Sequence, residues 1–140
     1  MQETKYANAR AVNARAVMKM IYVSHPYTGN EEANVEDAMK VTNRLAQATK
    51  GSFLFVNPLA VFGDMGETLT YDQILDQCLE LLDRCDGVIF CDGWTRSRGC
   101  QAEMDKALQA NKAIWFGPEH FIAKNWKQKI VNVKELKGNG

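Results

Sequence analysis

Residues 71–91 read YDQILDQCLELLDRCDGVIFC, and this stretch decides the fold. Within 71–85 the apolar side chains recur at helical spacing, which predicts an amphipathic helix. Residues 86–91 then form a short, nearly continuous apolar run, which is typical of a strand that is buried on both faces. A helix that leads directly into such a strand is the repeating unit of a parallel α/β sheet.

The same alternation extends in both directions along the chain. Further strands are predicted at 19–23, 53–56, 113–116 and 130–133, and further helices at 31–50, 99–111 and 119–127. Residues 57–70 are expected to form a long loop. The pattern predicts a doubly wound, mostly parallel α/β sheet of five strands in the order 2-1-3-4-5, similar to flavodoxin and Rossmann folds.

We expect one domain over residues 19–140, preceded by an N-terminal helical extension at 1–18. That extension carries a short duplication, Asn-Ala-Arg-Ala-Val at 8–12 and again at 13–17. A chain of 140 residues, 46% of them apolar, is long enough to bury a core and does not have the composition of a disordered protein.

The composition also excludes several function classes. Charge is balanced at 17 basic and 17 acidic residues, which argues against a protein that binds a nucleic acid polymer. No run of 18 apolar residues is present, so we expect no membrane span. The four cysteines form no C-x-x-C pair, and the two histidines lack ligand spacing to them. We therefore expect no metal, no cofactor and reduced thiols in a cytoplasmic protein.

The strand order locates the candidate site. In an open parallel sheet, ligands bind beyond the carboxyl ends of the strands, where the strand order reverses. For the order 2-1-3-4-5 this point lies between strands one and three, and residues 24–30 and 92–98 follow those strands. Both loops are polar and contain glycine. We therefore expect them to form a binding site.

Four side chains near these loops are able to carry chemistry. Glu103 lies inside the helix after strand three, and Ser97 lies near its start, where backbone N–H groups favour an anion. Tyr22 lies near the end of strand one, and Asp92 follows strand three. A carboxylate beside a phenol and an anion site suits attack on the anomeric carbon of a sugar.

Three of these four residues also have a purely structural interpretation. Glu103 is then a solvated helix residue, and Ser97 is only an N-cap. Tyr22 belongs to the core, with its hydroxyl on a backbone carbonyl. Trp94 either packs in the core or forms a wall for a base, and His25 is a hydrogen-bonding loop residue rather than a base.

Several short motifs together resemble the nucleoside 2-deoxyribosyltransferase-like superfamily. They are YVSHPYTG at 22–29, Asn57-Pro58, CDGVIFCDGW at 85–94, SRG at 97–99, and Ala102-Glu103. The closest resemblance is to small, often phage-encoded domains that begin with Y-x-S-x-P-x-T-G. It covers roughly residues 19–116.

This resemblance implies roles for individual residues. Glu103 matches a nucleophile that attacks C1′ and displaces the base, Tyr22 matches the tyrosine that positions it, and Ser97 matches a 5′-phosphate-binding serine. The implied activity is that of an N-glycosidase on a (deoxy)nucleoside 5′-monophosphate, with water accepting the glycosyl group. We expect the residues that bind this small-molecule nucleotide to be Ser24, Pro26, Gly29, Asn57, Trp94, Ser97 and Gly99.

One position departs from the resemblance. Cys78 stands where the superfamily commonly has an aspartate that handles the proton of the departing base. A mostly neutral thiol replaces that acid poorly, and Asp76 points elsewhere on the helix. Asp92, our third candidate catalytic residue, or Asp64 supplies the proton instead. Otherwise the domain binds a nucleotide or a nucleotide-derived signal without turnover.

Two further alternatives concern the reaction and the assembly. A deoxyribosyltransferase passes the sugar to a second base and needs no phosphate site. A structural or partner-binding domain uses its polar loops only for solvation. We also expect a homodimer or a higher homo-oligomer, for which the aromatic residues from Trp115 to Trp126 offer a surface.

Overall fold

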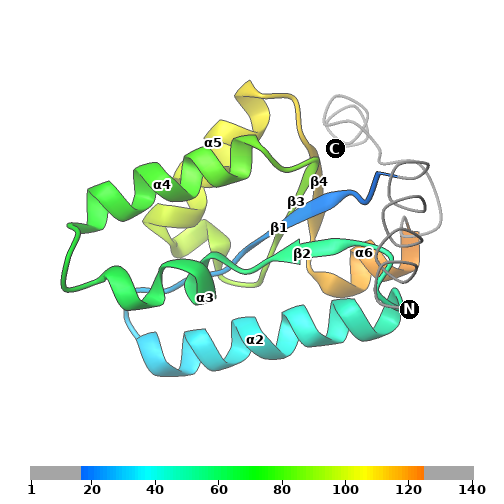
Figure 1. The fold of residues 1–140 in the computed structure, drawn as a ribbon, viewed down its shortest axis with the longest axis horizontal. Helices are drawn as coiled ribbons and strands as arrows, with labels where there is room; N and C mark the ends of the chain where they lie inside the picture. Colours follow the sequence, from blue (N-terminus) through cyan, green and yellow to red (C-terminus); the bar gives the residue numbers. More distant parts are fainter. Residues whose placement is uncertain (1–16, 125–140) are drawn as a thin grey trace, which may run out of the picture.

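A computed structural model describes residues 17–124 of the chain. Most of the expected N-terminal extension, the end of the helix predicted at 119–127 and the strand predicted at 130–133 lie outside the described residues. Within them, the chain forms an α/β structure with a single sheet (Figure 1).

The sheet has four strands in the order β2-β1-β3-β4, and all neighbouring strands are parallel. The strands are β1 (Met20–Ser24), β2 (Leu54–Val56), β3 (Gly87–Phe90) and β4 (Ala113–Phe116). The predicted order of the first four strands is confirmed. The prediction of five strands is not: the described residues form only four, because the run assigned to the fifth lies beyond residue 124.

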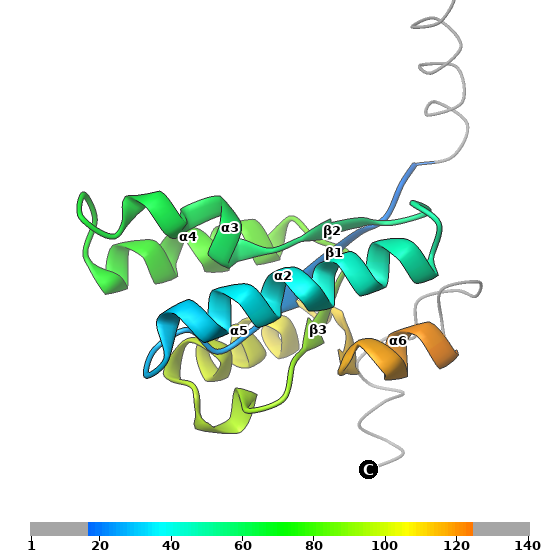
Figure 2. The ribbon, with the colours of Figure 1, turned by 90° about the horizontal axis from the view of Figure 1, so that it is seen from below.

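Helices cover both faces of the sheet, as expected of a doubly wound fold. They are α2 (Glu31–Ala48), α3 (Pro58–Phe62), α4 (Tyr71–Asp83), α5 (Arg98–Gln109) and α6 (Pro118–Lys124). Figure 1 shows α4 and α5 on one side of the strands and α2 and α6 on the other. Figure 2, seen from below, places α2 in front of the strands.

The core has two parts, one on each face of the sheet. On the face that α4 and α5 cover, Leu82 and Ala107 pack with Val88 of β3. On the opposite face, Leu45 of α2 belongs to the same cluster as Trp115 and Phe121. Because both faces of β1, β3 and β4 are buried, their sequences are continuous apolar runs rather than alternating ones.

The aromatic residues that we expected at a subunit interface are divided by this core. Trp115 and Phe121 are fully buried, and their rings meet edge to face at 4.8 Å between centroids. Phe116 is half exposed, and Trp126 lies outside the described residues. Within the described part of this stretch, Phe116 is therefore the large aromatic side chain available for contact with another molecule.

Residues 57–70 contain a short helix where the sequence predicted only a loop. Asn57 caps α3 by accepting a hydrogen bond from the Leu59 N–H at 3.1 Å, and Pro58 occupies the first helical position. A 3₁₀ turn, η1 (Gly63–Met65), follows directly. Proline ends a strand but also starts a helix well, since its missing N–H needs no partner there. The prediction used only the first of these properties.

Two polar contacts fix the ends of the elements around the central strand pair. Asp86 accepts a hydrogen bond from the Met20 N–H at 2.8 Å, which ties the start of β1 to the residue before β3. Thr70 and Gln73 form a reciprocal capping box at the start of α4.

Among the described residues, no helix is long and apolar enough to cross a bilayer.

We predict that Gly87→Ala destabilises the fold. A Cβ at this buried position would lie 2.6 Å from Cζ3 of Trp115 and 3.2 Å from the Ala113 carbonyl oxygen. Because a packed core resists added volume, the free energy of unfolding should fall by about 1–3 kcal/mol in urea titrations. The matched control is Gly63→Ala, whose Cβ meets nothing within 4 Å and which should cost little. Equal stability of the two variants would contradict the packing of β3 against Trp115.

Candidate active site

The loops after β1 and β3 meet at one edge of the sheet, as the strand order predicts. Ser24, the last residue of β1, lies opposite Phe90, the last residue of β3. The N–H of Cys91 donates to the Ser24 carbonyl at 2.9 Å, which extends this pairing by one residue. The polar segments after these two strands therefore begin side by side.

Glu103 of α5 is buried at this edge, with 5% of its surface exposed. The Tyr22 hydroxyl donates to Oε2 of Glu103, and the Ser24 hydroxyl donates to Oε1 at 2.8 Å. Tyr22 and Ser24 are two positions apart in a strand, so their side chains point to the same face, toward α5. Glu103 is therefore not a solvated helix residue, and the Tyr22 hydroxyl binds a carboxylate rather than a backbone carbonyl.

Burial determines the pKa values of Glu103 and Tyr22. Removal from water raises the pKa of Glu103 to about 7, although the hydrogen bonds from Tyr22 and Ser24 oppose that shift. Burial, together with the charge of Glu103, raises the pKa of Tyr22 well above its ordinary value. Tyr22 thus stays protonated and acts as a donor. Near neutral pH Glu103 is divided between its acid and its carboxylate.

Cys78 of α4 lies close to this pair and lines the same cavity as Glu103. Burial, and then the charge of Glu103, raises the pKa of the Cys78 thiol to about 11, so it is neutral at physiological pH. Asp76 is exposed, as its place on the helix predicted. All four cysteines of the chain are free.

Three cavities adjoin around these residues. The carboxylate cavity, of about 100 Å³, is lined by Glu103 together with His25, Tyr71, Cys78, Ser97 and apolar neighbours. No second carboxylate is among its lining residues. The arginine cavity, of about 640 Å³, is lined by Arg96 and Arg98 with Asp92, Asn34, Thr28, Pro26, Tyr71, Gly93 and Ser97. The apolar cavity, of about 90 Å³, is lined by Pro58, Leu59, Phe62, Ile74, Tyr27, Cys78 and two glycines.

The lining residues that they share show how the cavities connect. Thr28, Tyr71 and Ser97 line both the carboxylate and the arginine cavity. Tyr27, Pro58, Leu59, Ile74 and Cys78 line both the carboxylate and the apolar cavity. The buried carboxyl group therefore lies between a large polar, arginine-lined space and a small apolar one.

Ser97 and Gly99 connect α5 to this site. The Ser97 hydroxyl accepts a hydrogen bond from the Cys100 N–H at 3.2 Å, so it is the N-cap of α5 as well as a cavity residue. A Cβ at Gly99 would lie 3.1 Å from the Tyr71 hydroxyl oxygen. Glycine at this position leaves room for the tyrosine to approach the start of the helix.

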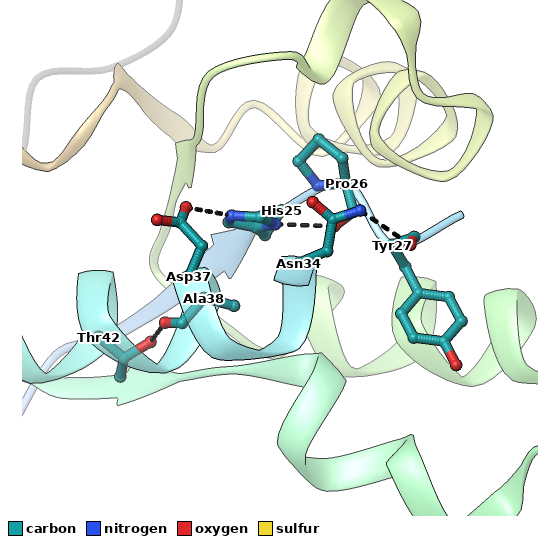
Figure 3. Close-up of polar contacts among 7 residues, drawn as sticks. All are labelled: His25, Pro26, Tyr27, Asn34, Asp37, Ala38 and Thr42. Carbon is teal, nitrogen blue, oxygen red and sulfur yellow. Dashed lines mark hydrogen bonds and ion pairs between the residues drawn. The ribbon is translucent and has the colours of Figure 1, made fainter. Parts of the chain in front are cut away.

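His25 fastens the loop after β1 to α2 (Figure 3). Its Nε2 lies 2.7 Å from a carboxylate oxygen of Asp37, and its Nδ1 lies 2.7 Å from the Pro26 carbonyl oxygen. Both ring nitrogens therefore face an oxygen atom. Asn34 adds a hydrogen bond to the Tyr27 carbonyl at 2.9 Å. These contacts hold the segment that contributes Pro26, Tyr27 and Thr28 to the cavities.

The other residues that the sequence predicted for the site do not line the carboxylate cavity. Asp92 and Pro26 line the arginine cavity, apart from the carboxylate cavity. Asn57 caps α3, next to the lining residue Pro58. Gly29 takes a positive φ of 106° in the turn before α2, a conformation that favours glycine. Asp64, in η1, is exposed.

Trp94 takes a packing position. Its ring centroid lies 5.5 Å from that of Phe90 and 5.9 Å from that of Phe116, and the indole packs against the core on the α4/α5 face. It does not line any of the three cavities described here. These contacts support the packing interpretation of Trp94, and its assignment to base binding stays a prediction.

Sequence reasoning missed three residues of the site. Arg96 and Arg98 flank Ser97 in the sequence. Their positive charge beside an expected anion site was the signal that could have identified them. Tyr71 begins α4, far along the chain from both loops, and only the packing of α4 against α5 brings it to the cavity edge. Among residues 17–124, no group of three or more potential metal-ligating side chains is present.

The comparisons with known proteins identify the family without adding a function. Residues 19–116 match a family described as a domain of unknown function, DUF4406, and the chain belongs to it. A search of curated proteins found no match. The matched span contains all four strands and every residue of the three cavities.

We predict that the Glu103 carboxyl makes stability depend on pH. Its pKa rises from 4.5 to about 7 on folding, so between these values the folded state binds more protons than the unfolded state. The free energy of unfolding should therefore fall as pH rises from 5 to 8, by on the order of 3 kcal/mol. Glu103→Gln should lose this dependence and be relatively more stable at pH 8. Urea titrations at several pH values test this.

The control for this measurement is Glu67→Gln, which changes an exposed glutamate. It should keep the pH dependence of the wild type. If Glu103→Gln and Glu67→Gln show the same slope, the buried carboxyl is not the group that titrates.

Proposed function

We propose that this member of the DUF4406 family is an N-glycosidase that hydrolyses the bond between base and sugar in a nucleoside 5′-phosphate, with Glu103 as nucleophile. The observation that carries the proposal is the buried Glu103 carboxyl, held by the Tyr22 and Ser24 hydroxyls in a cavity between a polar and an apolar space. The resemblance to deoxyribosyltransferase-like proteins points to the same reaction.

In the first step, an oxygen of ionised Glu103 attacks C1′ of the sugar. The bond between C1′ and the base nitrogen breaks, its electron pair leaves with the base, and a proton from water neutralises the base. The glycosyl group is then held as an ester on Glu103. The apolar cavity, with Leu59 and Phe62 in its wall, suits a flat base that leaves in this direction.

In the second step, water attacks C1′ and the ester bond to Glu103 breaks. The sugar leaves with a hydroxyl at C1′, and the proton of the water passes to solvent, which regenerates the carboxylate. Tyr22 and Ser24 keep the carboxyl oriented through both steps, because each hydroxyl binds one of its oxygens. These two residues are in place before substrate arrives, which lowers the entropic part of the barrier.

The arginine cavity suits the 5′-phosphate. Guanidinium groups bind phosphate oxygens through paired hydrogen bonds, and Arg96 and Arg98 lie in its wall with the Ser97 hydroxyl. Asp92 lies in this cavity and not beside Glu103, so we assign it to binding hydroxyl groups of the substrate rather than to proton transfer.

A second candidate function is binding without turnover. It is favoured by Cys78, a neutral thiol, and by the absence of a second carboxylate among the residues that line the carboxylate cavity. Without an acid, departure of the base depends on solvent alone, and a slow or absent reaction leaves a nucleotide-binding protein. The same residues serve both functions, so a measurement of turnover decides between them.

The free thiols suit a reducing compartment, and a cytoplasmic location stays a prediction. Assembly into a homodimer or a higher homo-oligomer stays a prediction, for which the exposed ring of Phe116 is the described candidate contact.

We predict that the wild-type protein releases free base from nucleoside 5′-phosphates and that Glu103→Gln slows this release by at least about a thousandfold. The variant should still bind the nucleotide, because only the nucleophile is lost. For the wild type, kcat/KM should rise roughly tenfold from pH 6 to pH 8, as Glu103 ionises around 7. Chromatography of the free base measures the rate, and calorimetry measures binding.

Glu67→Gln is the control here as well and should retain full activity. Nucleotide binding without base release from the wild type would replace the enzymatic proposal by the binding one. Base release that survives in Glu103→Gln would contradict the assignment of the nucleophile.

A further inference from the structure

The arginine cavity is much larger than one phosphoryl group requires. Its volume of about 640 Å³ lies within the range of cavities that enclose a whole drug-sized ligand, whereas the carboxylate cavity measures about 100 Å³. A nucleoside 5′-monophosphate with its sugar at Glu103 would place a single phosphate there. Most of the cavity would then remain filled with water.

The cationic groups of this cavity come from two separate positions. Arg98 is fixed by an ion pair to Asp72 at 2.9 Å and by stacking over the Tyr71 ring, 5.2 Å from its centroid. Arg96, on the 3₁₀ turn η2 (Trp94–Arg96), lies against Gly93 and has no ion-pair partner among the described residues. One guanidinium is thus partly neutralised and held in place, while the other is available to an anion.

Away from the two arginines, the wall is suited to hydroxyl and amide hydrogen bonds, so within this cavity a second phosphoryl group has its place at Arg96. Asp92 offers carboxylate oxygens, which accept hydrogen bonds from hydroxyl groups and repel a phosphate. Asn34 and Thr28 add further polar groups along the same wall. The cavity therefore combines anion-binding arginines with acceptors of the kind that bind a sugar.

We propose that the substrate of this site is a nucleotide with a pyrophosphate group, either a nucleoside 5′-diphosphate or an ester of one, whose second phosphoryl group lies at Arg96 in the arginine cavity. The inference rests on the proposed function for the position of the sugar at Glu103. It goes beyond that function by naming the class of substrate. Arg96 is then the residue that distinguishes diphosphates from monophosphates.

The experiment measures binding to Glu103→Gln, which keeps substrates intact. Calorimetry compares adenosine, its 5′-monophosphate, its 5′-diphosphate and a pyrophosphate-linked dinucleotide. A charge-assisted contact to a second phosphoryl group should make the diphosphate or the dinucleotide bind at least about tenfold more tightly than the monophosphate. If the diphosphate binds more tightly than the dinucleotide, the natural ligand is a free diphosphate. If the dinucleotide binds more tightly, the natural ligand is an ester.

The matched variants in this background are Arg96→Ala and Arg84→Ala. Arg84 is an exposed arginine at the end of α4, paired with Glu80 and absent from the cavity wall. Arg96→Ala should lower the affinity for the diphosphate about tenfold and the affinity for the monophosphate less than about threefold. Arg84→Ala should change neither affinity. A circular dichroism spectrum like that of the parent shows that each variant is folded.

The outcomes separate this inference from the proposed function. Equal affinity for monophosphate and diphosphate, or equal losses for both in Arg96→Ala, would overturn the pyrophosphate proposal even if the wild type releases base. If the wild type releases no base from any of these compounds, the enzymatic proposal fails. The order of affinities in Glu103→Gln still decides the ligand class in that case.

Discussion

The site depends on one interaction, the pair of hydroxyl groups that hold the buried Glu103 carboxyl. Burying an ionisable group without partners is costly, and here Tyr22 and Ser24 each donate to one of its oxygens. Because both hydroxyls come from β1, the central strand fixes the position of a group that α5 carries. The helix cannot rotate or slide without leaving the carboxyl unpaired inside the protein.

This constraint explains the electrostatic division of the site. Burial raises the pKa of Glu103, while the arginines line the larger cavity and not the carboxylate cavity. A guanidinium beside Glu103 would lower that pKa and pair with the carboxylate. The separation leaves the carboxyl group free to react with a sugar carbon and leaves the arginines free for phosphate oxygens.

The loop after β1 is fastened by a second buried polar group, His25, between Asp37 and the Pro26 carbonyl (Figure 3). It connects α2, which covers one face of the sheet, to a loop that lines cavities near the helices of the other face. The walls of the site are thus supported from both faces. Gly99, which leaves room for Tyr71, provides a comparable fit between α4 and α5.

The sequence by itself determined the periodicities, and with them the four described strands, their order and the edge where loops 24–30 and 92–98 meet. It also indicated Glu103, Tyr22 and Ser97, because residue type and position after a strand are local properties. It did not determine that Trp94 packs against Phe90, that Asp92 lies apart from Glu103, or that Asn57-Pro58 starts a helix. Those outcomes depend on which surfaces meet when the helices pack on the sheet. Only the tertiary structure placed Tyr71 in the wall of the carboxylate cavity, because the contact between α4 and α5 joins residues that no local pattern relates.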